Sequence, residues 1–169
     1  MSRSAVFGLA LGLSLALQGC GLRPLYSGGQ NGPVAQVLRS VAIGKIDGRA
    51  GWLVRTALED RLGKADPQPR FRLEVELNDD IEGFGIRGDN AVTRERRSLR
   101  ARYRLVDAAK GTVLLDATAG SDAGIDVVSS EYATVAAEQT ALERLAKEVA
   151  DQIVARVALY ASRGGGAAQ

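Results

Sequence analysis

Residues 71–77 read Phe71-Arg72-Leu73-Glu74-Val75-Glu76-Leu77, with apolar and charged side chains in strict alternation. Successive side chains of a β-strand point to opposite faces of a sheet, so the pattern predicts a strand with one buried and one wet face. Residues 98–105 repeat it, with Leu99, Ala101, Tyr103 and Leu105 at the apolar positions. A sheet with one apolar face needs a second layer to cover that face, and this requirement decides the fold.

Two further strands are predicted beside this pair. Residues 37–46 are rich in β-branched and aliphatic side chains and end at Asp47-Gly48. Residues 112–118 follow a turn that ends at Gly111 and form the last strand. The polar stretch between residues 78 and 98 is expected to be a long loop.

Two amphipathic helices supply the second layer. Apolar residues recur at three- and four-residue spacing from Ala50 to Leu62, where Gly63 ends the pattern. The same spacing runs from residue 131 to 160, behind Ser130 as the N-cap. The order strand, helix, three strands, helix predicts an α+β fold: a two-layer sandwich with both helices packed on one face of a four-stranded mixed sheet.

The N-terminus carries an export signal. Arg3 precedes an apolar stretch over residues 6–17, which as a helix would reach only about 18 Å, too short for a hydrocarbon core of about 30 Å. Leu17-Gln18-Gly19-Cys20 resembles the lipobox of bacterial lipoproteins, and Cys20 is the only cysteine. Because a thiolate can accept a diacylglyceryl group, the sequence predicts a membrane anchor of acyl chains, palmitate among them, on Cys20. An ordinary secretory signal with an incidental cysteine is the alternative.

These patterns divide the chain into four parts. Residues 1–19 are predicted to be a lipoprotein signal peptide, and residues 20–33, rich in Gly and Pro, a lipidated flexible tether. A single α+β domain is predicted over residues 34–163. Residues 164–169 are predicted to be a disordered tail.

Composition excludes several classes of function. The 169 residues carry a formal charge of only +2, which is too small to indicate nucleic-acid binding. The chain has no histidine, so the commonest general base is missing. Residues 83–88 spell G-x-G-x-x-G, but a strand rather than a helix is expected after them, which argues against a dinucleotide loop. Residues 78–89 carry polar side chains near the spacing of a calcium-binding loop. They lack Asp at the first position and Glu at the twelfth, which argues against a calcium site. We therefore expect a protein that is not an enzyme and has no metal site, cofactor or nucleic-acid partner.

An arginine-rich segment is the strongest candidate for a binding site. Arg94, Arg96, Arg100, Arg102 and Arg104 share one parity and so one sheet face, while Arg97 points to the other. One interpretation is structural, with Glu74, Glu76 and Asp116 as cross-strand partners. The other is that three carboxylates cannot neutralise five arginines, so that a phosphorylated, anionic lipid lies on this face.

The chain also resembles a known family. Cys20-Gly21-Leu22-Arg23-Pro24-Leu25-Tyr26 is similar to the mature N-terminus of LptE, the lipopolysaccharide-assembly lipoprotein family. The resemblance continues through Ile43, Ile46 and Arg49 and through residues 130–153. It covers most of the chain.

The resemblance implies a function. Family members have two helices on a four-stranded sheet and sit on the periplasmic side of the outer membrane. They lie inside the β-barrel LptD, whose assembly and delivery of lipopolysaccharide to the cell surface they assist. We therefore expect an outer-membrane lipoprotein with an LptD-like barrel and lipopolysaccharide as partners, and with a membrane anchor at Cys20. The alternative is an auxiliary lipoprotein of a phospholipid transport system of the ABC/MCE type.

Overall fold

The computed structural model describes residues 32–63, 65–86 and 92–165. Its sheet has the strand order β1-β2-β3-β4, with β1 parallel to β2 and the other pairs antiparallel. The strands are β1 Val41–Ile43, β2 Phe71–Ile86, β3 Val92–Asp107 and β4 Val113–Asp126. The helices are α2 Pro33–Arg39, α3 Gly48–Leu62 and α4 Glu131–Tyr160, which runs into a π turn, Ala161–Gly165.

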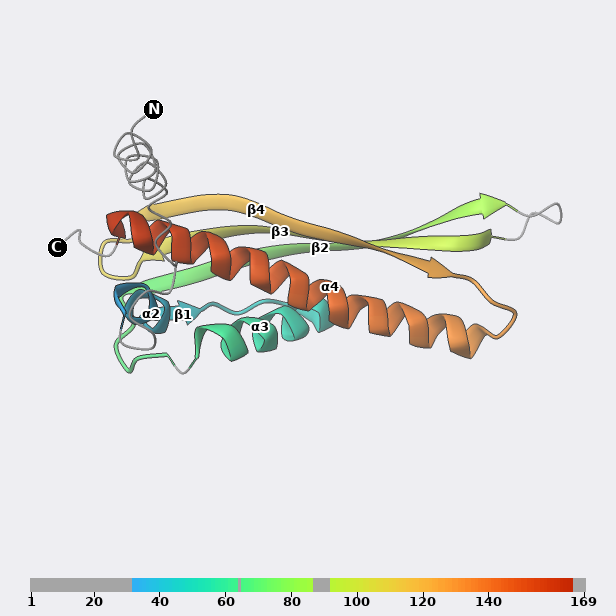
Figure 1. The fold of residues 1–169 in the computed structure, drawn as a ribbon, viewed down its shortest axis with the longest axis horizontal. Coiled ribbons are helices and arrows are strands. Elements are labelled where there is room, and N and C mark those ends of the chain that lie inside the picture. Colours follow the sequence, from blue (N-terminus) through green and yellow to red (C-terminus); the bar gives the residue numbers. More distant parts are fainter. Residues whose placement is uncertain (1–31, 64, 87–91, 166–169) are drawn as a thin grey trace, which may run out of the picture.

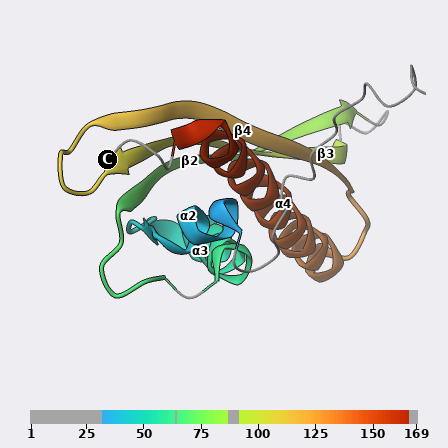
Figure 2. The ribbon, with the colours of Figure 1, turned by 60° about the vertical axis from the view of Figure 1, so that its left-hand side comes forward.

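All three helices lie on one side of the sheet, and the other side is bare (Figures 1 and 2). This arrangement confirms the predicted α+β class and the two-layer plan, with a short third helix added. The molecule is elongated. α2 and the last turns of α4 lie at one end, and the hairpin of β2 and β3 reaches the other, which we call the distal end. No helix of the described residues has the length and apolarity needed to cross a membrane.

The first strand was predicted too long. The structure forms a helix, α2, from Pro33 to Arg39 and leaves only Val41–Ile43 as a strand. Pro33 at the first helical position pre-sets a helical φ, and Val34, Val37 and Leu38 are buried at three- and four-residue spacing. β-branched content favoured a strand, but this spacing and the proline favour the helix.

The predicted polar loop was wrong over residues 78–86 and 92–98; residues 87–91 lie outside the described residues. β2 and β3 pair without a register break from Phe71↔Asp107 to Ile86↔Val92. β4 likewise continues beyond residue 118 to Asp126. Gly, Asn and Asp disfavour strands, but the pairing continues because carboxylates of β2 lie opposite arginines of β3.

The core lies between the sheet and the helices. Leu73, Leu99 and Leu105 of the sheet are fully buried, as the alternation predicted, and share one apolar cluster with Leu58 of α3 and Leu145 of α4. Each such side chain contributes about 1.5–3 kcal/mol on burial. Both predicted helices are confirmed: α3 ends before Gly63, at φ 78°, and α4 begins after Ser130, whose hydroxyl accepts from the Ala133 amide at 3.4 Å.

Several predictions lie outside the described residues. These are the signal peptide 1–19, Cys20, the tether up to residue 31, the end of the G-x-G-x-x-G stretch and the tail beyond residue 165.

Candidate functional site

The bare side of the sheet carries the predicted arginines. We call it the outer face, defined by the even-numbered residues of β2, β3 and β4, because their odd-numbered neighbours such as Leu73 and Leu99 point into the core. Arg94, Arg96, Arg100, Arg102 and Arg104 all belong to it, so the predicted shared parity is confirmed. Arg97 points to the helix side, also as predicted.

Each of the five arginines contacts a carboxylate on a neighbouring strand. Arg96 Nη2 lies 2.7 Å from Glu82 Oε2, and Arg100 Nη2 lies 2.9 Å from Asp122 Oδ2. The remaining pairs are Arg94–Asp126 at 3.3 Å, Arg102–Asp116 at 2.9 Å, and Arg104 with both Glu74 and Glu76 at 3.4 Å. Most of these side chains are 40% or more exposed. Exposed pairs of this kind contribute only about 0–1 kcal/mol each.

The premise that three carboxylates face five arginines is therefore wrong. Within the described strand residues, the outer face carries one more carboxylate than arginine. The arginines are Arg72, Arg94, Arg96, Arg100, Arg102 and Arg104; the carboxylates are Glu74, Glu76, Asp80, Glu82, Asp116, Asp122 and Asp126. Glu82, Asp122 and Asp126 were missed because their segments were not recognised as strands. Parity along continuous strands would have found all three.

Hydrogen bonds lower the pKa values of two carboxyl groups on the outer face. A hydrogen bond from Arg102 holds the pKa of Asp116 below its ordinary value of 3.8. Hydrogen bonds from Ser98 and Arg100 lower the pKa of Asp122 in the same way. A carboxylate with a lowered pKa stabilises the fold above its ordinary pKa, and this contribution is lost as the pH falls through the lowered value. Asp116 and Asp122 therefore remain charged at neutral pH.

A shallow hollow of about 770 Å³ lies near the middle of the outer face. Its lining includes Arg100, Arg102, Glu76 and Gly120. A Cβ atom on Gly120 would lie 2.6 Å from Arg100 Cδ, so the glycine makes room for the arginine side chain to lie flat across β4. Arg100 in turn donates to the Ser121 carbonyl at 3.0 Å. The hollow offers two guanidinium groups, both already engaged by carboxylates.

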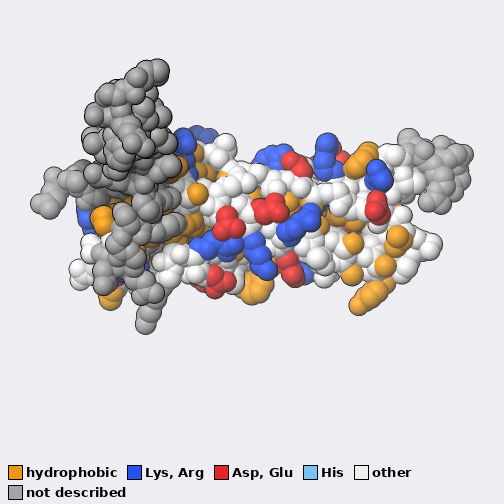
Figure 3. Space-filling model, viewed as in Figure 1, with side chains coloured by type: hydrophobic (Ala, Val, Ile, Leu, Met, Phe, Trp, Pro, Cys, Tyr) orange, Lys and Arg blue, Asp and Glu red, His pale blue; other side chains and the backbone are white. Residues whose placement is uncertain are grey.

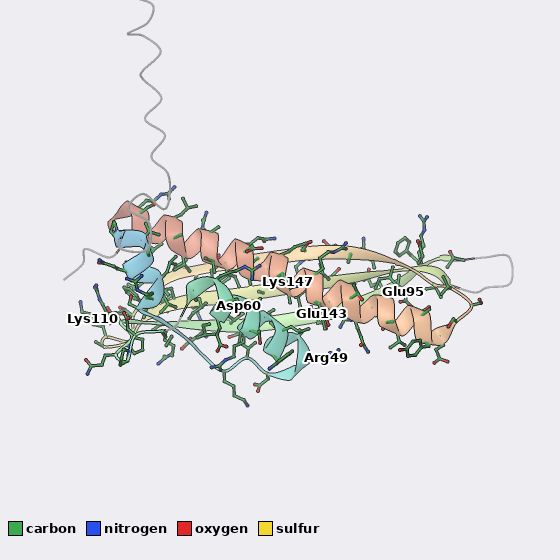
Figure 4. All side chains as sticks on the ribbon, turned by 60° about the horizontal axis from the view of Figure 1, so that its bottom comes forward. Arg49, Asp60, Glu95, Lys110, Glu143 and Lys147 are labelled. Atoms are coloured by element: carbon green, nitrogen blue, oxygen red, sulfur yellow. The ribbon has the colours of Figure 1, made fainter. Side chains whose placement is uncertain are left out.

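A second polar cluster, which the sequence did not reveal, lies on the helix side. Arg97 donates to both oxygens of Asp79, at 2.8 and 2.6 Å, and to the carbonyl of Glu138 in α4 at 3.0 Å. The Arg97 side chain is only 12% exposed. Its contacts link the hairpin of β2 and β3 to the N-terminal part of α4. Glu95 also interacts with Glu138 and lies toward the distal end (Figure 4).

The Glu95 carboxyl is the unsatisfied member of this cluster. Its Oε2 is buried without a hydrogen-bond partner among the described residues. Loss of water raises the pKa of Glu95, and the neighbouring Glu138 carboxylate raises it further. An acid with a raised pKa stabilises the fold when protonated. This contribution is lost as the pH rises from the ordinary value of 4.5 through the raised one.

We therefore expect Glu95→Gln to stabilise the protein at pH 7. The amide carries no charge and can donate to Glu138, so the gain is about 1 kcal/mol, seen as a higher midpoint of urea unfolding. The gain should shrink below pH 4.5, where Glu95 is protonated. Glu143→Gln, at an exposed position of α4 (Figure 4), is the control and should change little. Equal midpoints for Glu95→Gln and wild type at pH 7 would contradict the assignment.

Residues 38–157 match the family model described as LptE, lipopolysaccharide-assembly. That range takes in β1 to β4, α3 and all but the last turn of α4. The chain belongs to the LptE family. No functionally curated protein matches the sequence.

Solved structures share the LptE fold. A protein from Caulobacter crescentus CB15, described as a lipoprotein, is 27% identical with a TM-score of 0.64, over 76% of this chain and 96% of that one. Rare lipoprotein B from Shewanella oneidensis is 10% identical with a TM-score of 0.58, over 73% and 96%. A minor lipoprotein from Acinetobacter baumannii is 12% identical with a TM-score of 0.59, over 70% and 90%. The last two support the fold alone.

Proposed function

We propose that this chain is an outer-membrane lipoprotein that partners the lipopolysaccharide translocon, a β-barrel of the LptD type, and aids its assembly and its delivery of lipopolysaccharide to the cell surface. The observation that carries the proposal is membership of the LptE family over residues 38–157. The resemblance of Leu17–Cys20 to a lipobox supports a periplasmic, lipid-anchored location. No observation favours the alternative role in phospholipid transport.

The outer face suits a polar partner. The interior wall of a transmembrane β-barrel is polar, in contrast to its lipid-facing side. An elongated sheet face with interleaved cations and anions complements such a wall, because exposed ion pairs can exchange partners at little cost in free energy. The helix side carries both signs of charge as well, with exposed apolar side chains over the N-terminal part of α4 (Figure 3).

We further propose that the arginines at positions 94, 96, 100, 102 and 104 bind the phosphates of lipopolysaccharide. A planar guanidinium binds phosphate through two parallel hydrogen bonds. Because each arginine is paired, the phosphate must displace a carboxylate such as Glu82 or Asp122. Arg96 and Arg100 are the most informative pair, since they flank Ser98 at the centre of β3.

Two opposite variants test this role. Arg96→Gln with Arg100→Gln should lower lipopolysaccharide affinity by at least about tenfold, because two charged hydrogen-bond donors are lost. Glu82→Gln with Asp122→Asn should raise affinity, because it removes the competing carboxylates. The measurement is lipopolysaccharide binding by the full-length protein at two salt concentrations, and wild-type affinity should fall at high salt. Equal affinity for all three proteins would leave these arginines a structural role only.

A further inference from the structure

The two long edges of the sheet differ in how they are covered. On β4, the Gln152 side chain of α4 accepts from the Gly120 amide at 3.1 Å and donates to the Gly120 carbonyl at 3.0 Å. One side-chain amide thus occupies the two backbone groups that a neighbouring strand would use. Ser121 Oγ donates to Glu148 of the same helix at 2.5 Å. α4 therefore protects the edge of β4.

The edge of β2 has no such cover beyond its first residues. β1 pairs only with Phe71–Leu73, and the last bond from that side runs from the Gly44 amide to the Leu73 carbonyl at 2.8 Å. Phe71 and Leu73 point their backbone groups away from β3, and the β2–β3 register is unbroken. The odd-numbered residues that follow must therefore do the same. We call four of these residues the open edge: Leu77, Asp79, Ile81 and Gly83. Among the described residues, none of their backbone groups has a hydrogen-bond partner.

This segment has the features of a template for another strand. Residues 78–85 are exposed on both faces, since α4 packs on β3 and β4 and α3 covers only the start of β2. Ile81 is 40% exposed on the helix side. β2 contains no proline and no bulge, two of the devices that block an edge. The four residues of the open edge, spread over residues 77–83, offer backbone groups for strand addition.

The charges at the open edge select its occupant. Asp79 and Glu82 are already paired with Arg97 and Arg96, but Asp80 has no ion-pair partner among the described residues. An added strand therefore gains from a Lys or Arg opposite Asp80 and an apolar side chain beside Ile81. A second copy of this chain does not fit, because antiparallel pairing of two such edges would set Asp80 against the acidic residues of its partner.

We propose that the open edge of β2 binds an extended, basic segment of a partner protein by strand addition. The segment presents cationic side chains on the outer face and apolar side chains on the helix side, and its backbone pairs with Leu77, Asp79, Ile81 and Gly83. This interface is separate from the arginines of β3, since it uses backbone groups at the sheet edge.

Hydrogen exchange of the full-length protein in detergent, with a synthetic peptide of alternating Lys and Val as the probe, tests the proposal. At a peptide concentration tenfold above its Kd, the amides of Leu77, Asp79, Ile81 and Gly83 should exchange about tenfold more slowly. The amides of Asn78, Asp80 and Glu82 already bond to β3 and should keep their rates. Protection without this odd–even pattern, or no protection, would overturn the proposal.

Two controls separate backbone pairing from charge attraction. A peptide N-methylated at the amides that would face β2 keeps its charge but should not protect the open edge. Ile81→Pro removes one outward amide without removing a β2–β3 hydrogen bond and should weaken peptide binding at least tenfold, whereas Ile81→Val should not. If Ile81→Pro fails to fold, the N-methylated peptide still tests whether binding requires backbone pairing. Equal binding of both peptides, or self-association of the protein through this edge, would contradict a basic partner strand.

Discussion

Cys20→Ala is expected to abolish membrane anchoring. The thioether that carries the lipid can form only on a thiol, and Cys20 is the only cysteine in the chain. Each acyl CH₂ buried in a bilayer contributes about 0.8 kcal/mol, so loss of two or three chains removes essentially all of the anchor. The variant should be found as an uncleaved, larger precursor or as soluble protein, without radiolabelled palmitate. Gel mobility, lipid labelling and membrane fractionation measure these outcomes together.

Ser27→Ala, seven residues further along the predicted tether, is the matched control and should be processed and anchored as wild type. A Cys20→Ala protein that still fractionates with the outer membrane in lipidated form would contradict the predicted anchor.

Most of the fold could be predicted from the alternation of apolar and polar residues. Leu73 and Leu99 mark the buried parity of β2 and β3, and that parity placed the two predicted helices on the correct side of the sheet. A pattern of period two can bury only one face, so the layer order follows from the sequence alone. The same reasoning put all five arginines on one face and Arg97 on the other.

The distal half of the sheet could not be predicted in this way. Residues 78–85 are exposed on both faces, so no apolar alternation is present there to mark a strand. Their strand structure depends on pairing with residues far along the chain, through contacts such as Arg97–Asp79 and Arg96–Glu82. Long-range pairs of this kind have no local signature, and local propensity yields to them.

The strands predicted too short led to a wrong prediction of the charge on the outer face. Because the sequence predicts a loop over residues 78–98 and a last strand that ends at residue 118, it assigns no position opposite the arginines to Glu82, Asp122 or Asp126. That prediction makes the outer face strongly cationic, whereas its described residues are close to neutral. A phosphate ligand on this face must therefore compete with carboxylates. In the proposed contact with lipopolysaccharide, each arginine exchanges its carboxylate partner for a phosphate.

Co-purification from outer membranes tests the proposed role most directly. The full-length chain, tagged after Gln169 and extracted in mild detergent, should bring down a large β-barrel protein in stoichiometric amount. Cys20→Ala should lose most of this complex, because the protein no longer reaches the outer membrane. Recovery of the barrel is the result that the account predicts. Recovery of an inner-membrane phospholipid transport complex in place of a barrel would contradict it.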